Sequence, residues 1–599
     1  MRIDRVWGLP HFADSVEPRD RRGEVQWYSE RISFEANQVV DLDFTDPTRQ
    51  VIHAGTLFRR SDPLKRSVNG WKELWVILFD NYLVMTKPKG KGDEVKYVVW
   101  KSPVRIELLA LSSLSVRPVQ RSNTLSRIMR TGRDSPDLLS IFSDNSTAGN
   151  HDNNYHPLSF HCHGKHGGTY TLYATTPDER NEWRRRMKEA IGAQRAVQAN
   201  QSVFDLETIT DNTCPDKDGS GHHPGLVTGR ISCSMPFSKD GHELVAIGSE
   251  DGIWIGMLHQ PETVQRVISV KHVTQLSFLE EHGFFLVLAE KVLHAIDIES
   301  IVPTPPPRRP SRPPVLGLQR LSRPNKHVDF FSAGRQSGRT LVIYKHRKGP
   351  DSVFTILEVN VATNYNPQLP PGFGAYREFF VPADSLDLLF LKTKVCILLS
   401  GGFEIMDITD FNSLSIPQDE DLRRVGKRPM TNKPLAMFRI REDEFLLCYD
   451  EYGLYVDKRG TPSRSPPIIE WEGAASQAAW HPPYVVLFGP AFIEIRHIES
   501  GRLAQVITGH DIRCTWDGRG IIRPEGIDEF ADPRTPRIHV VLDDSEMSSA
   551  FSANQHHLRS PGKRQHAVVL APTERLVVPG TRYSPSLLSV ADTLPVYVP

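Results

Sequence analysis

The chain has 599 residues, with 72 lysines and arginines against 72 aspartates and glutamates, so its formal net charge is zero. This balance argues against bulk electrostatic attraction to nucleic acid, and any attraction to a membrane must come from a local patch. Hydrophobic residues make up 39% of the chain, and no apolar run approaches the roughly 20 residues of a transmembrane helix.

The six cysteines are scattered and form no C-x-x-C pair, which is typical of reduced thiols inside a cell. Residues 1–47 are polar, and we expect an irregular N-terminal segment there. Strand patterns begin after the turn at Asp46-Pro47, and Asp80-Asn81 is expected to form a tight hairpin turn. The predicted strands are 53–59, 74–79, 82–86, 95–100, 106–111, 158–162 and 169–174. Residues 118–156 are rich in Arg, Ser, Asn and Asp, which predicts a mobile inserted loop.

The clearest helical pattern of the chain begins at Thr176. Thr176 is a good N-cap, Pro177 suits the first helical position and Glu179 supplies the carboxylate of a capping box. An apolar stripe follows at helical spacing, formed by Trp183, Met187, Ala190 and Ile191. This stripe predicts a helix that packs on the preceding sheet.

A polar linker is expected over 196–227, and a long β region follows it. Pairs of short apolar strands recur at spacings of about 40–55 residues, which suits one propeller blade per repeat. The pairs are 244–248 with 252–258, 284–289 with 292–298, 340–345 with 353–359, 395–399 with 403–408, 445–449 with 453–458, and 484–488 with 492–498. The fold class is therefore mainly β, with a propeller of seven blades over 228–545 and a partly disordered tail over 546–599.

A tract rich in proline and arginine, residues 303–324, interrupts this region and is expected to be a surface loop, because proline cannot occupy a central strand. Ser311 follows Arg308-Arg309-Pro310 and is a candidate phosphorylation site. The same tract could adopt polyproline II and bind an SH3 groove.

The first sheet and its helix resemble a pleckstrin-homology (PH) domain. Gly55-Thr-Leu57, the strands 71–79 and 82–84, and Trp183 in the helix carry the resemblance, which covers about residues 48–195. It implies a seven-stranded barrel or sandwich closed by one C-terminal helix.

The propeller region resembles the citron-homology (CNH) domain over about residues 228–545. The segments that carry this resemblance are 229–234, 243–254, 401–405 and 450–457. A PH domain followed directly by a CNH domain is similar to the fungal exchange factors for Rho-type GTPases. The resemblance implies a regulatory or scaffolding role, a Rho-type small GTPase or its regulators as partner, and a cytoplasmic location, peripheral at the plasma membrane.

In that family a helical Dbl-homology domain precedes the PH domain and performs the exchange. Only about fifty residues precede the PH region here, and they do not resemble such a helical bundle, so we expect no enzymatic activity from this chain alone. One rival is a CNH scaffold in vesicle trafficking, unrelated to GTPase exchange. Another is a propeller hydrolase with a metal ion on its axis.

Basic residues near the first strands are candidates for binding a phosphoinositide or membrane, since each phosphate contact is a charge-assisted hydrogen bond. They are Arg59, Arg60, Lys65, Arg66 and Lys72, with Lys87, Lys89 and Lys91 on a neighbouring segment. Leu74 occupies a position where phosphoinositide-binding PH domains usually carry arginine, so weak membrane attraction or protein docking remain alternatives. His161 and His163 share one face of a strand while Cys162 faces the other, so we expect no metal site, and no cofactor is implied.

Overall fold

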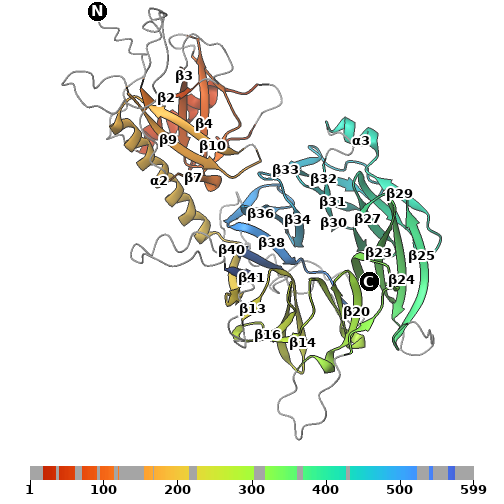
Figure 1. Ribbon diagram of the computed structural model, residues 1–599. Helices are drawn as coiled ribbons and strands as arrows, with labels where there is room; N and C mark the ends of the chain where they lie inside the picture. The colour runs from red at the N-terminus through yellow and green to blue at the C-terminus, as the bar shows by residue number, and fades with distance from the viewer. Residues whose placement is uncertain are drawn as a thin grey trace, which may run out of the picture. The chain divides into compact units, whose positions relative to one another are not determined.

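The computed structural model describes residues 18–35, 40–60, 71–90, 95–112, 119–120, 154–165, 167–214, 226–302, 317–359, 369–426, 432–522, 538–543 and 564–573. The chain divides into two compact units, Met1–Asn200 and Gln201–Pro599 (Figure 1). Among the described residues, no helix combines the length and the apolar character needed to cross a bilayer.

The first unit is a mainly antiparallel sheet that bends around one core and is closed by helix α2 (Pro177–Asn200). Its main strands follow the order β5-β4-β3-β2-β10-β9-β7. Their bounds are β2 (Val51–Arg60), β3 (Trp71–Phe79), β4 (Tyr82–Lys89), β5 (Lys96–Val99), β7 (Leu109–Leu111), β9 (Asn154–Cys162) and β10 (Gly168–Ala174). Three two-residue strands are added at the margins: β1 (Ile32–Ser33), β6 (Val104–Arg105) and β8 (Val119–Gln120).

Helix α2 begins as its sequence predicts. The Thr176 hydroxyl accepts a hydrogen bond from the Glu179 amide at 3.1 Å, and the Glu179 carboxylate accepts one from the Thr175 amide at 2.9 Å. Trp183 and Met187 are fully buried against the strands, so the predicted apolar stripe is the face that closes the core. The predicted strand 106–111 begins instead with a 3₁₀ turn, Ile106–Leu108, and only β7 pairs with β9.

The expectation of an irregular segment over 1–47 is wrong for part of it. Helix α1 (Pro18–Arg31) packs Trp27 and Tyr28 onto the sheet face opposite the main core, and β1 pairs in parallel with β5. Most of α1 is polar, and its few apolar residues acquire a partner only when the outer face of β3, β4 and β5 has formed. The sequence pattern of α1 alone therefore gave no helical signal.

The second unit is a propeller of seven sheets, which Figure 1 shows arranged radially around a common axis. We number these sheets as blades 1–7 and give the strands of each from the axis outward. Blade 1 is β14 (Ile231–Lys239), β15 (His242–Ser249), β16 (Ile253–Met257) and β17 (Gln260–Ile268); blade 2 is β18 (Val273–Leu279), β19 (Phe284–Ala289), β20 (Val292–Asp297) and β21 (Gln319–Arg320); blade 3 is β22 (Val328–Gln336), β23 (Arg339–Lys348), β24 (Asp351–Val359) and β25 (Phe373–Val381).

Blade 4 is β26 (Ser385–Phe390), β27 (Val395–Leu399), β28 (Gly402–Met406) and β29 (Ser413–Ile416); blade 5 is β30 (Pro434–Arg441), β31 (Glu444–Tyr449), β32 (Tyr452–Asp457) and β33 (Ile468–Glu470); blade 6 is β34 (Gln477–His481), β35 (Tyr484–Phe488), β36 (Phe492–His497) and β37 (Leu503–Thr508). The short helix α3 (Asp419–Arg424) connects blades 4 and 5. The six strand pairs predicted from the sequence correspond to the two central strands of blades 1–6.

Blade 7 joins the two ends of the propeller. Its inner strands are β38 (His510–Trp516), β40 (His539–Asp543) and β41 (Gln565–Pro572), and its outermost strand is β11 (Phe204–Thr210) from the start of the unit. The predicted linker 196–227 therefore contains a blade strand, and so does the predicted tail 546–599. The sequence did not predict β11, because four of its seven side chains are exposed and the strand therefore lacks an apolar pattern.

The remaining predicted loops lie partly outside the described residues. Residues 121–153 of the predicted insertion 118–156 and residues 303–316 of the tract 303–324, including Ser311, are among them. In the described part of that tract, β21 is the outer strand of blade 2, a position compatible with neighbouring prolines. Five cysteines are described with their side chains, and all five are buried free thiols.

Candidate functional site

Basic side chains gather at one end of the first unit's barrel. Arg59 on β2 lies directly opposite Lys72 on β3, and Lys89 on β4 lies directly opposite Lys96 on β5. Side chains alternate between the two faces of a strand, so each of these residues shares a face with the main core. Leu57, Leu74 and Met85 are the core residues two or four positions away on the same strands.

Lys87 shares this face, and Arg59, Lys72, Lys87, Lys89 and Lys96 therefore line the open end of the barrel on four adjacent strands. We call this set, together with Lys101, the basic mouth. The four mouth lysines on β3, β4 and β5 are exposed, whereas Arg59 is half-buried. Like charges on neighbouring strands repel one another, so the arrangement favours binding of an anion.

An aromatic floor supports the basic mouth. The Arg59 guanidinium lies 4.3 Å from the centroid of the Trp100 ring, and the Lys101 ammonium lies 5.3 Å from the same ring and 4.7 Å from that of Tyr170. Such cation–π contacts hold a cation in place without neutralising it. The Arg59 Nε is buried and makes no hydrogen bond among the described residues, so it retains a free donor.

One residue predicted to bind lipid, Arg60, does not belong to the basic mouth. Arg60 is opposite Trp71 and lies on the other face of β2, so it does not point into the basic mouth. Lys65, Arg66 and Lys91 lie outside the described residues. Sequence reasoning missed Lys96 and Lys101. The alternation of Lys96 with the buried residues Tyr97 and Val99 was the signal that could have placed it on the mouth side.

Among the described residues, His161 on β9 and His163 directly after it are not joined by a third metal-binding side chain. His161 and His163 have ring centroids 4.8 Å apart, while Cys162 points into the core from the opposite face. Across the described ranges, no group of three or more His, Cys, Asp and Glu side chains is brought together in a way that could hold a metal ion.

The axis of the propeller is crossed by its own chain. After β38 the chain enters the centre, where β39 (Ile521–Ile522) pairs in parallel with the innermost strand of blade 2. The Arg519 guanidinium reaches Asp387 of blade 4 at 2.8 Å and Asp517 at 2.7 Å. Blades 7, 2 and 4 are not neighbours, so these contacts link blades across the centre of the propeller. The guanidinium and its two carboxylates are paired with one another, which is typical of a structural contact between blades.

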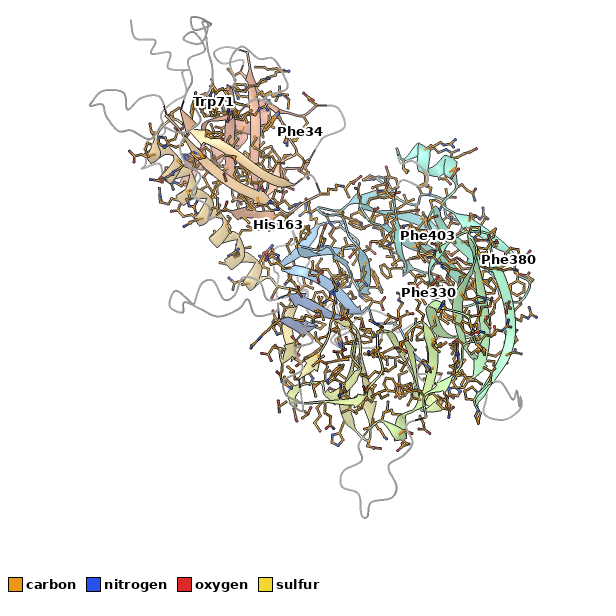
Figure 2. All side chains as sticks on the ribbon, in the orientation of Figure 1. Phe34, Trp71, His163, Phe330, Phe380 and Phe403 are labelled. Carbon is orange, nitrogen blue, oxygen red and sulfur yellow. The ribbon has the colours of Figure 1, made fainter. Side chains whose placement is uncertain are left out.

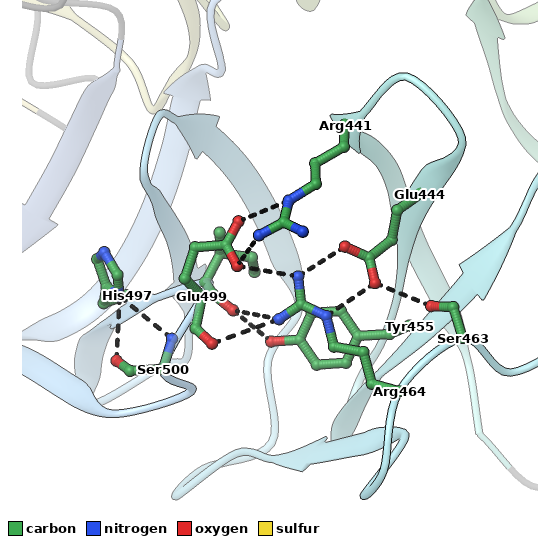
Figure 3. Close-up of polar contacts among 9 residues, drawn as sticks. Arg441, Glu444, Tyr455, Ser463, Arg464, His497, Glu499 and Ser500 are labelled. Atoms are coloured by element: carbon green, nitrogen blue, oxygen red, sulfur yellow. Dashed lines mark hydrogen bonds and ion pairs between the residues drawn. The ribbon is translucent and has the colours of Figure 1, made fainter. Parts of the chain in front are cut away.

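A polar cluster joins blades 5 and 6 at the edge of the propeller (Figure 3). Arg464 donates to both oxygens of Glu444, at 2.8 and 2.6 Å, and lies 3.2 Å from Glu499 of blade 6. Arg441 also pairs with Glu499, at 2.8 Å. The hydrogen bond from Arg464 keeps the pKa of Glu444 below its usual value. Most members are satisfied by one another, which is typical of a structural clamp and not of a catalytic site.

Comparison with known proteins agrees with this two-part architecture. The family model for the pleckstrin homology domain matches residues 51–191, and that for the CNH domain matches residues 241–518. Rho1 guanine nucleotide exchange factor 1 of Schizosaccharomyces pombe is 26% identical over 515 residues, which cover 82% of this chain and 35% of that protein. RHO1 GDP-GTP exchange protein 2 of Saccharomyces cerevisiae is 23% identical over 527 residues, with coverage of 82% and 35%.

Among solved structures, the AfRom2 CNH domain is 25% identical, with a TM-score of 0.44, and the match covers 57% of this chain and 94% of that one. The chain spans about a third of the length of the two curated relatives. It carries a PH domain followed by a CNH propeller, and it is homologous over most of its length to the fungal Rho1 guanine-nucleotide exchange factors.

Proposed function

We propose that this chain is the regulatory and scaffolding part of a Rho-family exchange factor. In this role the PH domain docks through its basic mouth to an anionic membrane surface, and the CNH propeller binds a Rho-type GTPase or one of its regulators. The names of the homologous proteins support the link to Rho1. The location that follows from this proposal is the cytoplasmic face of the plasma membrane.

The observation that carries the docking role is the row of cations across four strands at the barrel mouth. Strands lie about 4.8 Å apart, so the row spans on the order of 14 Å. That width accommodates a headgroup with several phosphates, and each phosphate contact adds a charge-assisted hydrogen bond. Protein docking through the same cations is the alternative use of this surface.

Vesicle co-sedimentation tests the docking role. The full chain should sediment with phosphatidylcholine vesicles that contain a phosphoinositide and stay in the supernatant with phosphatidylcholine alone, and added salt should weaken binding. Equal sedimentation with both kinds of vesicle, or with neither, would refute the membrane role.

Nucleotide release tests the regulatory role. The family models that match this chain are those of a PH domain and a CNH domain, and no exchange domain is among them. We expect the purified chain to bind a Rho-type GTPase in a pull-down without accelerating release of its labelled GDP. Robust acceleration would show that the chain itself catalyses exchange. Capture of vesicle-tethering proteins without any GTPase would favour the trafficking scaffold instead.

A further inference from the structure

Blade 3 presents an unusual combination of side chains on the side that faces blade 2. Four residues stand directly opposite one another across its strands, in the order Val328, His346, Val353 and Phe380. Neighbouring residues identify the side: Tyr344 packs with blade 2, whereas Phe379 packs with blade 4. Because side chains alternate, His346 and Phe380 face blade 2.

The residues of this row are buried on the inner strands and exposed on the outer strand. His346 and Val353 are 4% and 7% exposed, but Phe380 is 65% exposed, and it lies on the outer strand at the periphery of the propeller (Figure 2). An isolated exposed phenylalanine needs no explanation by itself. Its position at the end of a continuous row, on the outer edge of β25, which pairs only with β24 among the described strands, makes it a candidate anchor.

Basic residues surround the same row. The connection from blade 2 to blade 3 passes over it, since the Val328 amide donates to the Lys291 carbonyl at 2.9 Å. The exposed cations here are Lys291, Arg320, Arg323, Lys326 and Lys348. The nearby carboxylates are Glu290, Asp351, Glu378 and Asp329, the last of which is paired with Lys345 and Arg347. Arg323 and Glu378 are paired at 2.7 Å. Positive charge therefore predominates beside Phe380.

Two buried polar atoms on this side have no partner among the described residues. They are Nδ1 of His346 and Oγ1 of Thr355, each on a residue that is 4% exposed. Burial, followed by the nearby Lys326, lowers the pKa of His346, so its ring is neutral in the free protein. Buried polar groups without partners are uncommon, and here they coincide with an exposed aromatic ring and a basic loop.

We propose that this ledge, formed by the exposed Phe380 on β25 and the cations of 291 and 320–326 beside the buried His346, Val353 and Thr355, binds an extended acidic segment of a protein partner. The segment adds as a strand along the free edge of β25, its carboxylates meet the loop cations, and an apolar side chain packs on Phe380. Charge complementarity selects an acidic occupant. The inference rests on the proposed protein-binding role of the propeller and gives that role a location.

A defined probe tests the ledge. A fluorescein-labelled peptide that alternates glutamate with leucine should bind the full chain, and a peptide of the same length with lysine in place of glutamate should not. Phe380→Ser and Lys326→Glu should each weaken the affinity about fivefold or more, which is the typical loss for an interface anchor. Leu414→Ser and Lys458→Glu, exposed residues on blades 4 and 5, are the matched controls and should change it less than twofold.

Several outcomes would overturn the ledge. They are no binding of the acidic peptide, equal binding of the lysine peptide, or equal losses in the control variants. Binding to anionic vesicles that is lost in Lys326→Glu but kept in Phe380→Ser would assign the cations to a membrane and overturn the peptide assignment. The GTPase pull-down is scored separately, so the ledge can fail while the proposed function stands. Thermal unfolding of each variant confirms that it is folded.

Discussion

The guanidinium of Arg464 lies 4.0 Å from the centroid of the Tyr455 ring, and the Tyr455 hydroxyl donates to the carbonyl of Ile498 at 2.6 Å. Arg464 and Tyr455 belong to blade 5, whereas Ile498 follows β36 of blade 6 (Figure 3). The aromatic ring therefore supports the cation from one side while Glu444 binds it from another. This stacked arrangement holds two blades together at their edge.

Arg464→Ala should lower the free energy of unfolding by about 2–3 kcal/mol, because it leaves the poorly exposed Glu444 with only the Ser463 hydroxyl as a partner and removes the stacking on Tyr455. Tyr455→Phe should cost about 1 kcal/mol through loss of one buried hydrogen bond. Urea unfolding measures both. The control Arg459→Ala, at an exposed position nearby, should be close to neutral. A loss in Arg464→Ala no larger than in the control would mean that the cluster does not stabilise the propeller.

The buried His539 should make the stability of the propeller sensitive to acid. Burial lowers its pKa to about 3, and its Nδ1 lies 3.0 Å from the Ser234 hydroxyl. In the unfolded chain His539 is protonated below about pH 6.5, whereas in the folded chain it stays neutral down to about pH 3. The unfolded state therefore binds more protons in this window, and the free energy of unfolding falls as the pH falls. The slope from this group is at most about 1.4 kcal/mol per pH unit.

Melting curves between pH 4.5 and 7 check this prediction. His539→Asn removes the titrating ring and should flatten the dependence, whatever its effect on stability at pH 7. His510→Asn, at an exposed position, should keep the wild-type slope. An unchanged slope in His539→Asn would show that other groups cause the acid sensitivity.

The side chain of Gln505 in blade 6 holds the start of β11, the strand that closes the propeller. Its side-chain oxygen accepts hydrogen bonds from the amides of Val203 and Phe204, both at 2.9 Å, and its nitrogen donates to the Phe204 carbonyl at 2.9 Å. Gln505→Leu leaves these buried backbone groups unpaired and should cost about 2–4 kcal/mol. Amide exchange should accelerate first in β11 and β41, with β15 unaffected. Gln260→Leu, at an exposed position, is the control, and equal exchange in β11 of both variants would contradict the closing role.

The geometry of the basic mouth predicts that Lys72 and Lys89 contribute more to lipid binding than Arg60, which the sequence alone could not distinguish from them. Lys72→Ala and Lys89→Ala should each weaken binding to phosphoinositide vesicles by about three- to tenfold, since each removes a cation on the mouth side. Arg60→Ala removes the same charge from the opposite face and should have a much smaller effect. Co-sedimentation over a lipid titration measures all three. Equal losses in all three variants would mean that only overall charge matters.

Much of the architecture follows from local patterns in the sequence. The helix that closes the PH domain has its own cap and apolar stripe, so Thr176, Trp183 and Met187 predict it. The central strands of blades 1–6 are buried on both faces and appear as short apolar runs, for example 395–399 and 484–488. Inner and outer blade strands are partly exposed, which weakens their pattern, and only their pairing within the blades identifies them.

The candidate site was foreseeable in part. The sequence alone determined that cations cluster near the first PH strands, because charge is visible in any conformation. Only the tertiary structure decided that Lys96 and Lys101 join the basic mouth and that Arg60 leaves it, because the face of each residue depends on strand register. Likewise, the repeat of six strand pairs is visible in the sequence, but the ring is closed by β11 and β41, which pair residues more than 350 positions apart. Long-range pairing of this kind is set by the completed ring of blades, and no local pattern specifies it.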